Sequence, residues 1–179
     1  RSGCSFTGTL NITAGGFFVD GSTFAGNTRF NKTGTSSDNS AGNNVFQGDL
    51  ELINTAAGYF YMADNAVDTY NGNVQVSNLS TGDIRFGNGG GGATLAAGRT
   101  VTVGAGGYNA GQLLFRNFIQ VGGTPQNLNL GTSAMLYFYP GTIFNGNVSA
   151  NSGRLHFSGT TFNGTGTFTK TGLSTDVST

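Results

Sequence analysis

Short runs in which apolar and polar residues alternate recur along the whole chain, each bounded by glycine or asparagine. They include GTLNIT, GNTRFNK, GDLELIN and GNVQVSN as first runs, and GGFFVDG, GYFYMAD, GDIRFGN and GRLHFSG as second runs. Alternation with a period of two residues, ended by turn residues, is typical of β-strands. No stretch has a helical period, and each glycine would cost a helix up to about 1 kcal/mol relative to alanine. The sequence therefore predicts an all-β fold.

The runs group into coils that open on an aromatic residue or a leucine, often followed two residues later by glycine. Strands this short cannot bury a face alone, but coils stacked on one another share a continuous core. We therefore predict a parallel β-helix, or β-solenoid, of about eight coils, with an antiparallel β-sandwich as the structural alternative. The coil starts are Phe6, Phe24, Phe46, Tyr70, Leu95, the segment 126–128, Phe144 and Phe162.

In this register one set of apolar residues faces the core. The aromatic residues that open the coils are expected to form a ladder at one corner, and the glycine after them suits a close approach of the backbone at a bend. The predicted inward set is Leu10, Ile12, Phe17, Val19, Phe24, Phe30, Leu50, Leu52, Phe60, Met62, Val74, Val76, Ile84, Phe86, Val101, Val103, Leu113, Phe115, Val148, Leu155 and Phe157.

Two segments do not fit this register simply. In residues 134–140, AMLYFYP, alignment with the next coil turns Tyr137 and Tyr139 inward. A slip by one residue turns Leu136 and Phe138 inward instead, because such a slip exchanges the two faces of a strand. Both registers stay open at this stage. The segment 95–123 is long for one coil, and we expect residues 104–111 within it, GAGGYNAG, to form a protruding loop.

A longer repeat runs through the coils. Residues 1–41 aligned on residues 139–179, an offset of 138, are identical at 15 positions. Composition alone does not explain why the pattern Lys-Thr-Gly-Xaa-Ser-Xaa-Asp-Xaa-Ser recurs in register, with Lys32 and Asp38 matched by Lys170 and Asp176. We predict a solenoid array over residues 1–179, made of one repeat at about 1–138 and the start of the next at 139–179. The chain is then expected to be a piece of a longer protein.

Composition excludes several functional classes. Charged residues make up 9% of the chain, and eight basic residues balance eight acidic ones, so there is no basic surface of the kind that binds nucleic acid. With 36% hydrophobic residues, including 15 phenylalanines, the chain can bury a core and is not a disordered linker. No apolar run approaches the roughly 20 residues that a membrane helix needs. We predict neither a nucleic-acid partner nor a membrane span.

Three features of the sequence resemble catalytic or cofactor motifs. Residues 87–92, GNGGGG, fit the glycine spacing of a dinucleotide site, but a strand-like run follows where such a site needs a helix. His156 is the only histidine and Cys4 the only cysteine, and they lie far apart in sequence. Neither a nucleophile with its base nor a metal cluster can be assembled from them. We expect a surface loop, an outward histidine and no cofactor.

The acidic residues are few. Asp49 and Glu51 share the outward face of one predicted strand, as a paired-carboxylate site for glycoside hydrolysis would require, and also as a solvated strand face would. The prediction is a solvated face and no catalysis. Calcium is the one ion left open, at the turns that contain Asp38, Asp64 or Asp68, where amide and backbone oxygens lie nearby.

Outward aromatic residues are the stronger candidates for binding. Tyr59 and Tyr61 flank the inward Phe60, and Tyr137 lies on a later coil. Exposed tyrosines can stack on sugars or anchor a partner. Tyr59, Tyr61 and Tyr137 are therefore the candidate surface-binding residues, with a surface polysaccharide as a candidate partner.

Several of these segments together resemble a known class of protein. The pattern TFNGT followed by TFTKTG, then FNGNV and the glycine-rich ATLAAGRTVTVG, is similar to the repeat regions of large secreted bacterial surface proteins of the adhesin and filamentous-haemagglutinin kind. Such regions are right-handed parallel β-helices that serve as stalks, fibres or adhesive surfaces outside the cell. The resemblance therefore implies an extracellular, cell-surface location.

We expect a non-enzymatic fibre or stalk segment, without a capping element of its own, that contacts neighbouring copies of the repeat end to end. The first alternative, a carbohydrate-binding or carbohydrate-active β-helix, requires a groove where acidic and basic side chains converge. The second, an ice-binding solenoid, requires a flat and evenly spaced threonine array, which the uneven coil lengths disfavour. The third, a phage fibre, requires a symmetric trimer.

Overall fold

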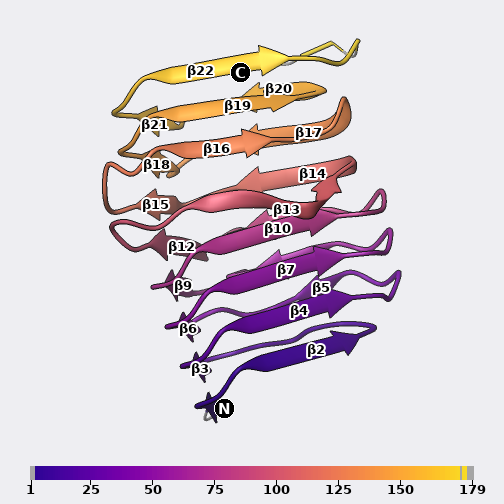
Figure 1. The fold of residues 1–179 in the computed structure, drawn as a ribbon, viewed down its shortest axis with the longest axis vertical. Coiled ribbons are helices and arrows are strands. Elements are labelled where there is room, and N and C mark those ends of the chain that lie inside the picture. Colours follow the sequence, from indigo (N-terminus) through magenta and orange to yellow (C-terminus); the bar gives the residue numbers. More distant parts are fainter. Residues whose placement is uncertain (1–2, 174, 177–179) are drawn as a thin grey trace.

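The computed structural model describes residues 3–173 and 175–176, and within them the chain forms strands, turns and bends but no helix. The strands build three sheets that run the length of the molecule, and the chain passes from one to the next as it winds upwards (Figure 1). Each strand pairing is parallel. The predicted all-β parallel solenoid is therefore confirmed, and the antiparallel sandwich is wrong.

The three sheets differ in the length and number of their strands. Sheet 1 contains β1 (Ser5–Phe6), β3 (Thr23–Phe24), β6 (Val45–Phe46), β9 (Val67–Tyr70), β12 (Gly92–Leu95), β15 (Phe118–Gln120), β18 (Ile143–Phe144) and β21 (Thr161–Phe162). Sheet 2 contains β2 (Leu10–Ala14), β4 (Thr28–Lys32), β7 (Leu50–Asn54), β10 (Val74–Asn78), β13 (Val101–Tyr108), β16 (Gln126–Asn129), β19 (Val148–Ser152) and β22 (Gly166–Lys170). Sheet 3 contains β5 (Asp38–Asn39), β8 (Phe60–Met62), β11 (Ile84–Phe86), β14 (Ala110–Phe115), β17 (Ser133–Phe138) and β20 (Arg154–Phe157).

The solenoid has about six complete turns, so the predicted count of eight is too high. Sheets 1 and 2 each have eight strands, but sheet 3 has six. On the third side of the first coil, the amides of Phe17 and Val19 donate to the side chains of Asp38 and Ser40, at 2.8 and 3.3 Å, and no strand ladder forms there. The predicted number came from the coil starts alone, and these do not indicate that the first coil lacks a strand on its third side.

The core lies inside the three sheets and follows the predicted inward set. Each predicted residue is either buried or packed against the buried cluster. The aromatic ladder is confirmed: the rings of Phe6, Phe24, Phe46 and Tyr70 stack in sequence, with centroids 5.1, 4.7 and 5.4 Å apart. Alternation therefore encodes the core, because one face of each strand turns towards the axis.

The corner between sheets 1 and 2 requires glycine. A Cβ built on Gly26 would lie 2.6 Å from the backbone of Gly8, and one on Gly72 would lie 2.2 Å from the carbonyl oxygen of Gly48. The same crowding recurs at Gly48 and Gly164. The glycine two residues after these aromatic residues is thus a position where the backbones of successive coils come too close for a side chain.

The structure shows the register of residues 134–140, which the sequence left open. Leu136 and Phe138 are fully buried, so they are the inward residues of β17, and Tyr137 lies on the outer face. Leu136 pairs with Leu113 on one side and with Leu155 on the other, which keeps one row of leucines along the core. That cross-coil match sets the register.

Two local predictions are wrong. Residues 104–111 form the end of β13 and the start of β14 and not a loop, because Tyr108 turns into the core and pairs with Asn78 after a register shift. The segment 126–128 lies in β16 and does not start a coil. The sixth coil starts with β15, where buried Gln120 occupies the position of the aromatic ladder and Phe118 stacks on Phe144.

Candidate functional site

The repeated sequence motif forms the same corner twice. The Lys32 ammonium lies 3.3 Å from Asp38, and the Lys170 ammonium lies 3.3 Å from Asp176. Asp38 accepts the amide of Phe17 at 2.8 Å, and Asp176 accepts the amide of Leu155 at 3.2 Å, which is the same contact one repeat later. The two corners therefore share their geometry as well as their sequence.

The two corners differ in burial. Both side chains of the Lys32–Asp38 pair are almost fully buried, at 0% and 1% exposure, whereas those of Lys170 and Asp176 are 32% and 35% exposed. Lys32 also donates to the carbonyl oxygens of Gly34 and Ser36. Burial raises the pKa of Asp38, although the amide of Phe17 and the charge of Lys32 oppose this change. The next coil is what removes the first pair from water.

A ladder of buried polar side chains lies at the corner between sheets 3 and 1. The amide of Ser22 donates to Asn44 at 3.0 Å, and the amide and side chain of Asn44 both donate to Asp68 at 2.9 Å. The Tyr70 hydroxyl donates to the other oxygen of Asp68 at 3.3 Å. Burial raises the pKa of Asp68 to about 6, against the lowering effect of the bonds from Asn44 and Tyr70. These contacts tie three coils together.

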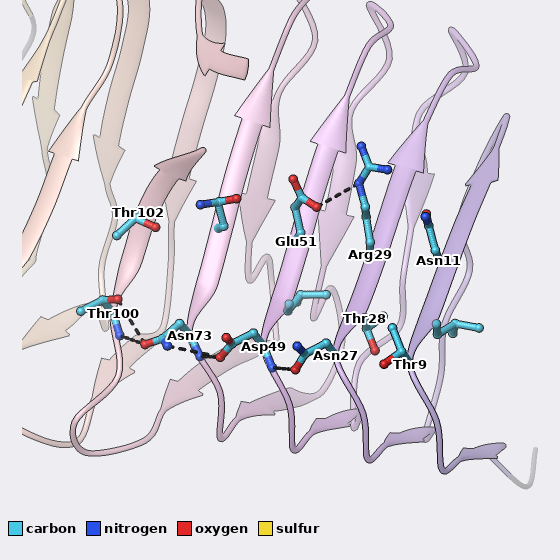
Figure 2. Close-up of a pocket in the computed structure, with 13 residues that line it drawn as sticks. Thr9, Asn11, Asn27, Thr28, Arg29, Asp49, Glu51, Asn73, Thr100 and Thr102 are labelled. Carbon is cyan, nitrogen blue, oxygen red and sulfur yellow. Dashed lines mark hydrogen bonds and ion pairs between the residues drawn. The ribbon is translucent and has the colours of Figure 1, made fainter. Parts of the chain in front are cut away.

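The outer face of sheet 2 carries a hollow of about 510 Å³ (Figure 2). Residues at the starts of five successive strands line it, from β2 to β13. They form two rows parallel to the axis, one at the corner and one on the strands. The corner row is Thr9, Asn27, Asp49, Asn73 and Thr100, and the strand row is Asn11, Arg29, Glu51, Gln75 and Thr102.

The corner row is held by hydrogen bonds between coils. Asn27 accepts the amide of Asp49 at 3.0 Å, and Asp49 in turn accepts the amide of Asn73 at 2.8 Å. Asn73 accepts both the amide and the hydroxyl of Thr100, at 3.1 and 3.2 Å. Each side chain thus satisfies the backbone of the following coil, which fixes the position of the row.

The two predicted carboxylates, Asp49 and Glu51, both face this hollow. One oxygen of Asp49 accepts from Asn73, and Glu51 forms an ion pair with Arg29 at 2.9 Å. Acidic and basic side chains therefore do converge in a hollow, as the carbohydrate-binding alternative requires.

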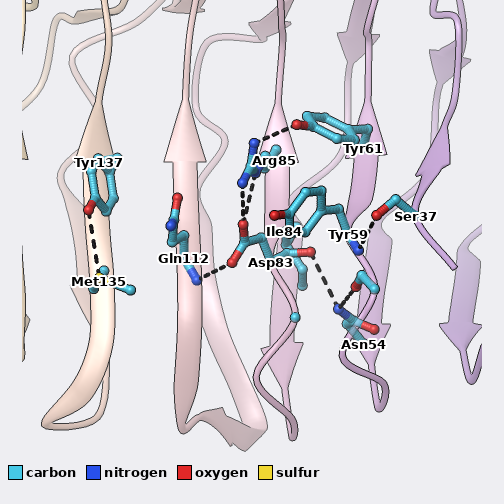
Figure 3. Close-up of polar contacts among 12 residues, drawn as sticks. Ser37, Asn54, Tyr59, Tyr61, Asp83, Ile84, Arg85, Gln112, Met135 and Tyr137 are labelled. Carbon is cyan, nitrogen blue, oxygen red and sulfur yellow. Dashed lines mark hydrogen bonds and ion pairs between the residues drawn. The ribbon is translucent and has the colours of Figure 1, made fainter. Parts of the chain in front are cut away.

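The outer face of sheet 3 brings Tyr59 and Tyr61 together around one cation (Figure 3). The Arg85 guanidinium carbon lies 4.2 Å from the ring centroid of Tyr59 and 5.0 Å from that of Tyr61. Arg85 also donates to Asp83 at 3.0 Å and to the Tyr61 hydroxyl. The sequence does not predict Arg85 as part of this cluster, because the cluster forms only when β8 and β11 stack.

Tyr137 belongs to a separate cluster on the same face. Its ring stacks on Tyr139 at 5.9 Å and on His156 at 5.0 Å, while the Arg116 guanidinium lies 4.7 Å from the ring of Tyr139. His156 lies on the outer face of β20, as predicted. Strand β14 separates this cluster from Arg85, so the three predicted tyrosines do not form one site.

The remaining candidates lie apart from these surfaces. Cys4 is exposed, with its thiol unpaired in the part of the chain that the structure describes. Residues 87–91 form a bend before β12, and strands follow them as expected. Of the three proposed calcium turns, Asp38 and Asp68 are buried in the contacts above, and Asp64 accepts from Asn88 at 2.8 Å. Among the described residues no group of three metal-binding acidic, histidine or cysteine side chains gathers.

The hollow on sheet 2 was missed at the sequence level apart from its two carboxylates. A signal exists: Asn27, Asp49, Asn73 and Asn147 each follow the corner glycine directly. A polar residue at the same position of successive coils must form a row once the coils stack. The strand row is harder to find, since its members share polarity but no residue type.

Comparison of the chain with protein-family models, with curated proteins and with solved structures gives no match.

Proposed function

We propose that the chain is a structural and adhesive segment of a fibre or stalk in a large extracellular repeat protein, and that it acts without catalysis. The observation that carries the proposal is the corner contact repeated after 138 residues, Lys32 with Asp38 and Lys170 with Asp176. A repeat whose copies make the same contacts can continue indefinitely along one axis, as a fibre requires.

The partner in this proposal is a neighbouring copy of the repeat, joined end to end. Strand β4 is covered by β7, which buries Phe30 and Lys32. Strand β22 repeats β4 in sequence, and its Phe168 is half-buried and Lys170 exposed. The kind of strand that covers β4 therefore also suits β22. It is a parallel strand that places an inward apolar side chain opposite Phe168.

The backbone supports the same partner. Within the described residues, β1, β2, β21 and β22 each pair on one side. An unpaired strand edge is a template for another strand. In β2, the amide of Leu10 donates to Asn27 in the next coil, so alternation turns the amide of Thr13 towards the unpaired side. A second copy would place its β22 against that edge.

Sedimentation velocity over a range of concentrations tests the proposal. We expect elongated oligomers that grow with concentration in the intact chain. Thr13→Pro removes an amide from the unpaired edge and leaves the pairing with β4 intact, so it is expected to reduce assembly; Thr13→Val is the matched control and keeps it. A monomer at all concentrations, or equal assembly of both variants, would contradict end-to-end contact.

A further inference from the structure

The hollow on sheet 2 continues beyond β13. A second hollow of about 270 Å³ lies on the same face of the same sheet, lined by residues of β16, β19 and β22. The two adjoin where Thr102 of β13 pairs with Asn127 of β16. We call the two together the axial trough. We propose that the axial trough binds one extended strand of a neutral polysaccharide lying along the solenoid axis, a binding function in addition to the proposed structural one.

The spacing of the strand row suits such a ligand. Asn11, Arg29, Glu51, Gln75 and Thr102 follow one another across successive paired strands (Figure 2). Neighbouring strands lie about 4.8 Å apart. The sugar units of an extended β-linked chain recur at a similar distance, so each coil presents one polar side chain to one sugar. A ligand with a different repeat would lose this match after a few coils.

The side chains of the row have hydrogen-bonding capacity left for a ligand. Within the described residues, the side chains of Asn11, Gln75 and Thr102 form no hydrogen bond, and all three line the first hollow. A primary amide both donates and accepts, and so does a hydroxyl. Sugar hydroxyls have the same dual character. The trough therefore complements a chain of hydroxyl groups better than an apolar segment, which would leave these groups unsatisfied.

The charge of the trough favours a neutral ligand. Arg29 is neutralised by Glu51 at 2.9 Å, and the nearby Asp49 has one oxygen without a hydrogen bond among the described residues. The lining of the first hollow thus holds one basic and two acidic side chains. A polyanion such as nucleic acid or a uronic-acid polymer would meet an excess of negative charge. A neutral glycan meets none of this repulsion.

The corner row makes the trough rigid before any ligand arrives. Asn27, Asp49 and Asn73 are each hydrogen-bonded to the backbone of the following coil, at 2.8–3.1 Å. A preformed surface loses little side-chain entropy on binding, which favours affinity. On sheet 3, by contrast, Arg85 and its two tyrosines engage one another and Asp83, so that surface has fewer groups left for a ligand.

Isothermal titration of the intact chain with soluble glucans, mannans, galactans and xylans tests this inference, with polygalacturonate as the anionic comparison. We expect a neutral polysaccharide to bind, with affinity that rises with oligosaccharide length until about eight sugars fill the axial trough, one for each strand of sheet 2. Polygalacturonate is expected to bind less tightly at low salt.

Variants locate the site. Asn11→Ala and Gln75→Ala each remove the polar end of an exposed side chain, and each is expected to weaken binding about fivefold, the equivalent of one hydrogen bond. Gln112→Ala, the same change on the outer face of sheet 3, and Tyr137→Ala are the controls, and both are expected to leave affinity unchanged. The proposal is overturned if no neutral polysaccharide binds, if only the polyanion binds, or if Tyr137→Ala weakens binding while Gln75→Ala does not. None of these outcomes depends on end-to-end assembly, which sedimentation measures separately.

Discussion

At the scale of single residues, burial decides what the same ion pair contributes. Lys32 with Asp38 and Lys170 with Asp176 have the same separation, 3.3 Å, but one pair is sealed from water and the other is partly exposed. Removing one partner of a buried pair leaves a charge without compensation, whereas exposed pairs contribute little.

We therefore expect Lys32→Met to lower the free energy of unfolding by about 3–5 kcal/mol and Lys170→Met to lower it by less than about 1 kcal/mol. Urea denaturation of the two variants and the parent chain provides the measurement. Equal losses in the two variants would show that burial by the next coil does not matter.

Asp68 gives the protein a pH dependence of known sign. Its pKa in the folded chain is about 6, above the ordinary value of 3.8, because it is buried. The folded state therefore holds this proton more tightly than the unfolded state does. The resulting stabilisation is complete at low pH and is lost as the pH rises towards and through 6.

Asp68→Asn should remove that loss. The amide oxygen can still accept from Asn44, and the amide nitrogen can donate to the Tyr70 hydroxyl. We compare the free energy of unfolding of the variant with that of the parent chain at two pH values. The difference, variant minus parent, is expected to be more favourable to the variant at pH 7 than at pH 4, by about 2–3 kcal/mol. Urea denaturation of the variant and the parent chain at pH 4 and at pH 7 measures this. If the two proteins differed in unfolding free energy by the same amount at both pH values, the raised pKa of Asp68 would be contradicted.

At the scale of the element, the corner glycines set how closely coils stack. A Cβ on Gly72 would lie 2.2 Å from a backbone oxygen of the coil below, and backbone cannot move aside as a flexible side chain can. Gly8 holds the same position in the first coil, and a Cβ there would meet no atom within 4 Å. Comparing Gly8 with Gly72 therefore separates the effect on stability of contact between coils from the effect of the local turn.

Gly72→Ala is expected to destabilise the chain by about 1–3 kcal/mol through overpacking, whereas Gly8→Ala should be neutral or slightly stabilising because it restricts the unfolded chain. Thermal denaturation of both variants tests this. If Gly8→Ala proved as harmful as Gly72→Ala, the requirement would lie in the local turn and not in the contact between coils.

Much of each element was predictable from local sequence. The alternation in GDLELIN and GNVQVSN identified β7 and β10 and their inward residues, because a strand with one buried face must alternate. The aromatic residues at the coil starts, such as Phe46 and Tyr70, predicted the aromatic ladder in the same way. These features depend on one coil and its immediate repetition.

The rest depends on which residues meet after stacking. Gln120 occupies an aromatic position, and sequence alone gives no sign that it is buried. The Arg85 cluster requires strands from two coils, and the axial trough requires the stacking of all eight strands of sheet 2. Tyr108 reaches the core through an irregular register that no periodic pattern encodes. Contacts between coils are long-range in sequence, so the binding surfaces were harder to predict than the strands.

At the scale of the whole molecule, we propose that one repeat is one unit of a continuous solenoid. Strand β19 repeats β2 after 138 residues, and sheet 2 has six strands before β19, β2 included. One repeat therefore corresponds to six strand spacings along the axis. The Lys–Asp contact recurs at equivalent positions 138 residues apart, which supports this proposal.

The most direct test is the solution length of a chain extended by one repeat, in which residues 42–179 follow residue 179. Small-angle X-ray scattering measures the length of this chain and of the original one. A continuous solenoid predicts a single rod of unchanged cross-section that is longer by about 29 Å, six strand spacings of about 4.8 Å. Two bodies joined by a flexible link, or an unchanged maximum dimension, would contradict the account.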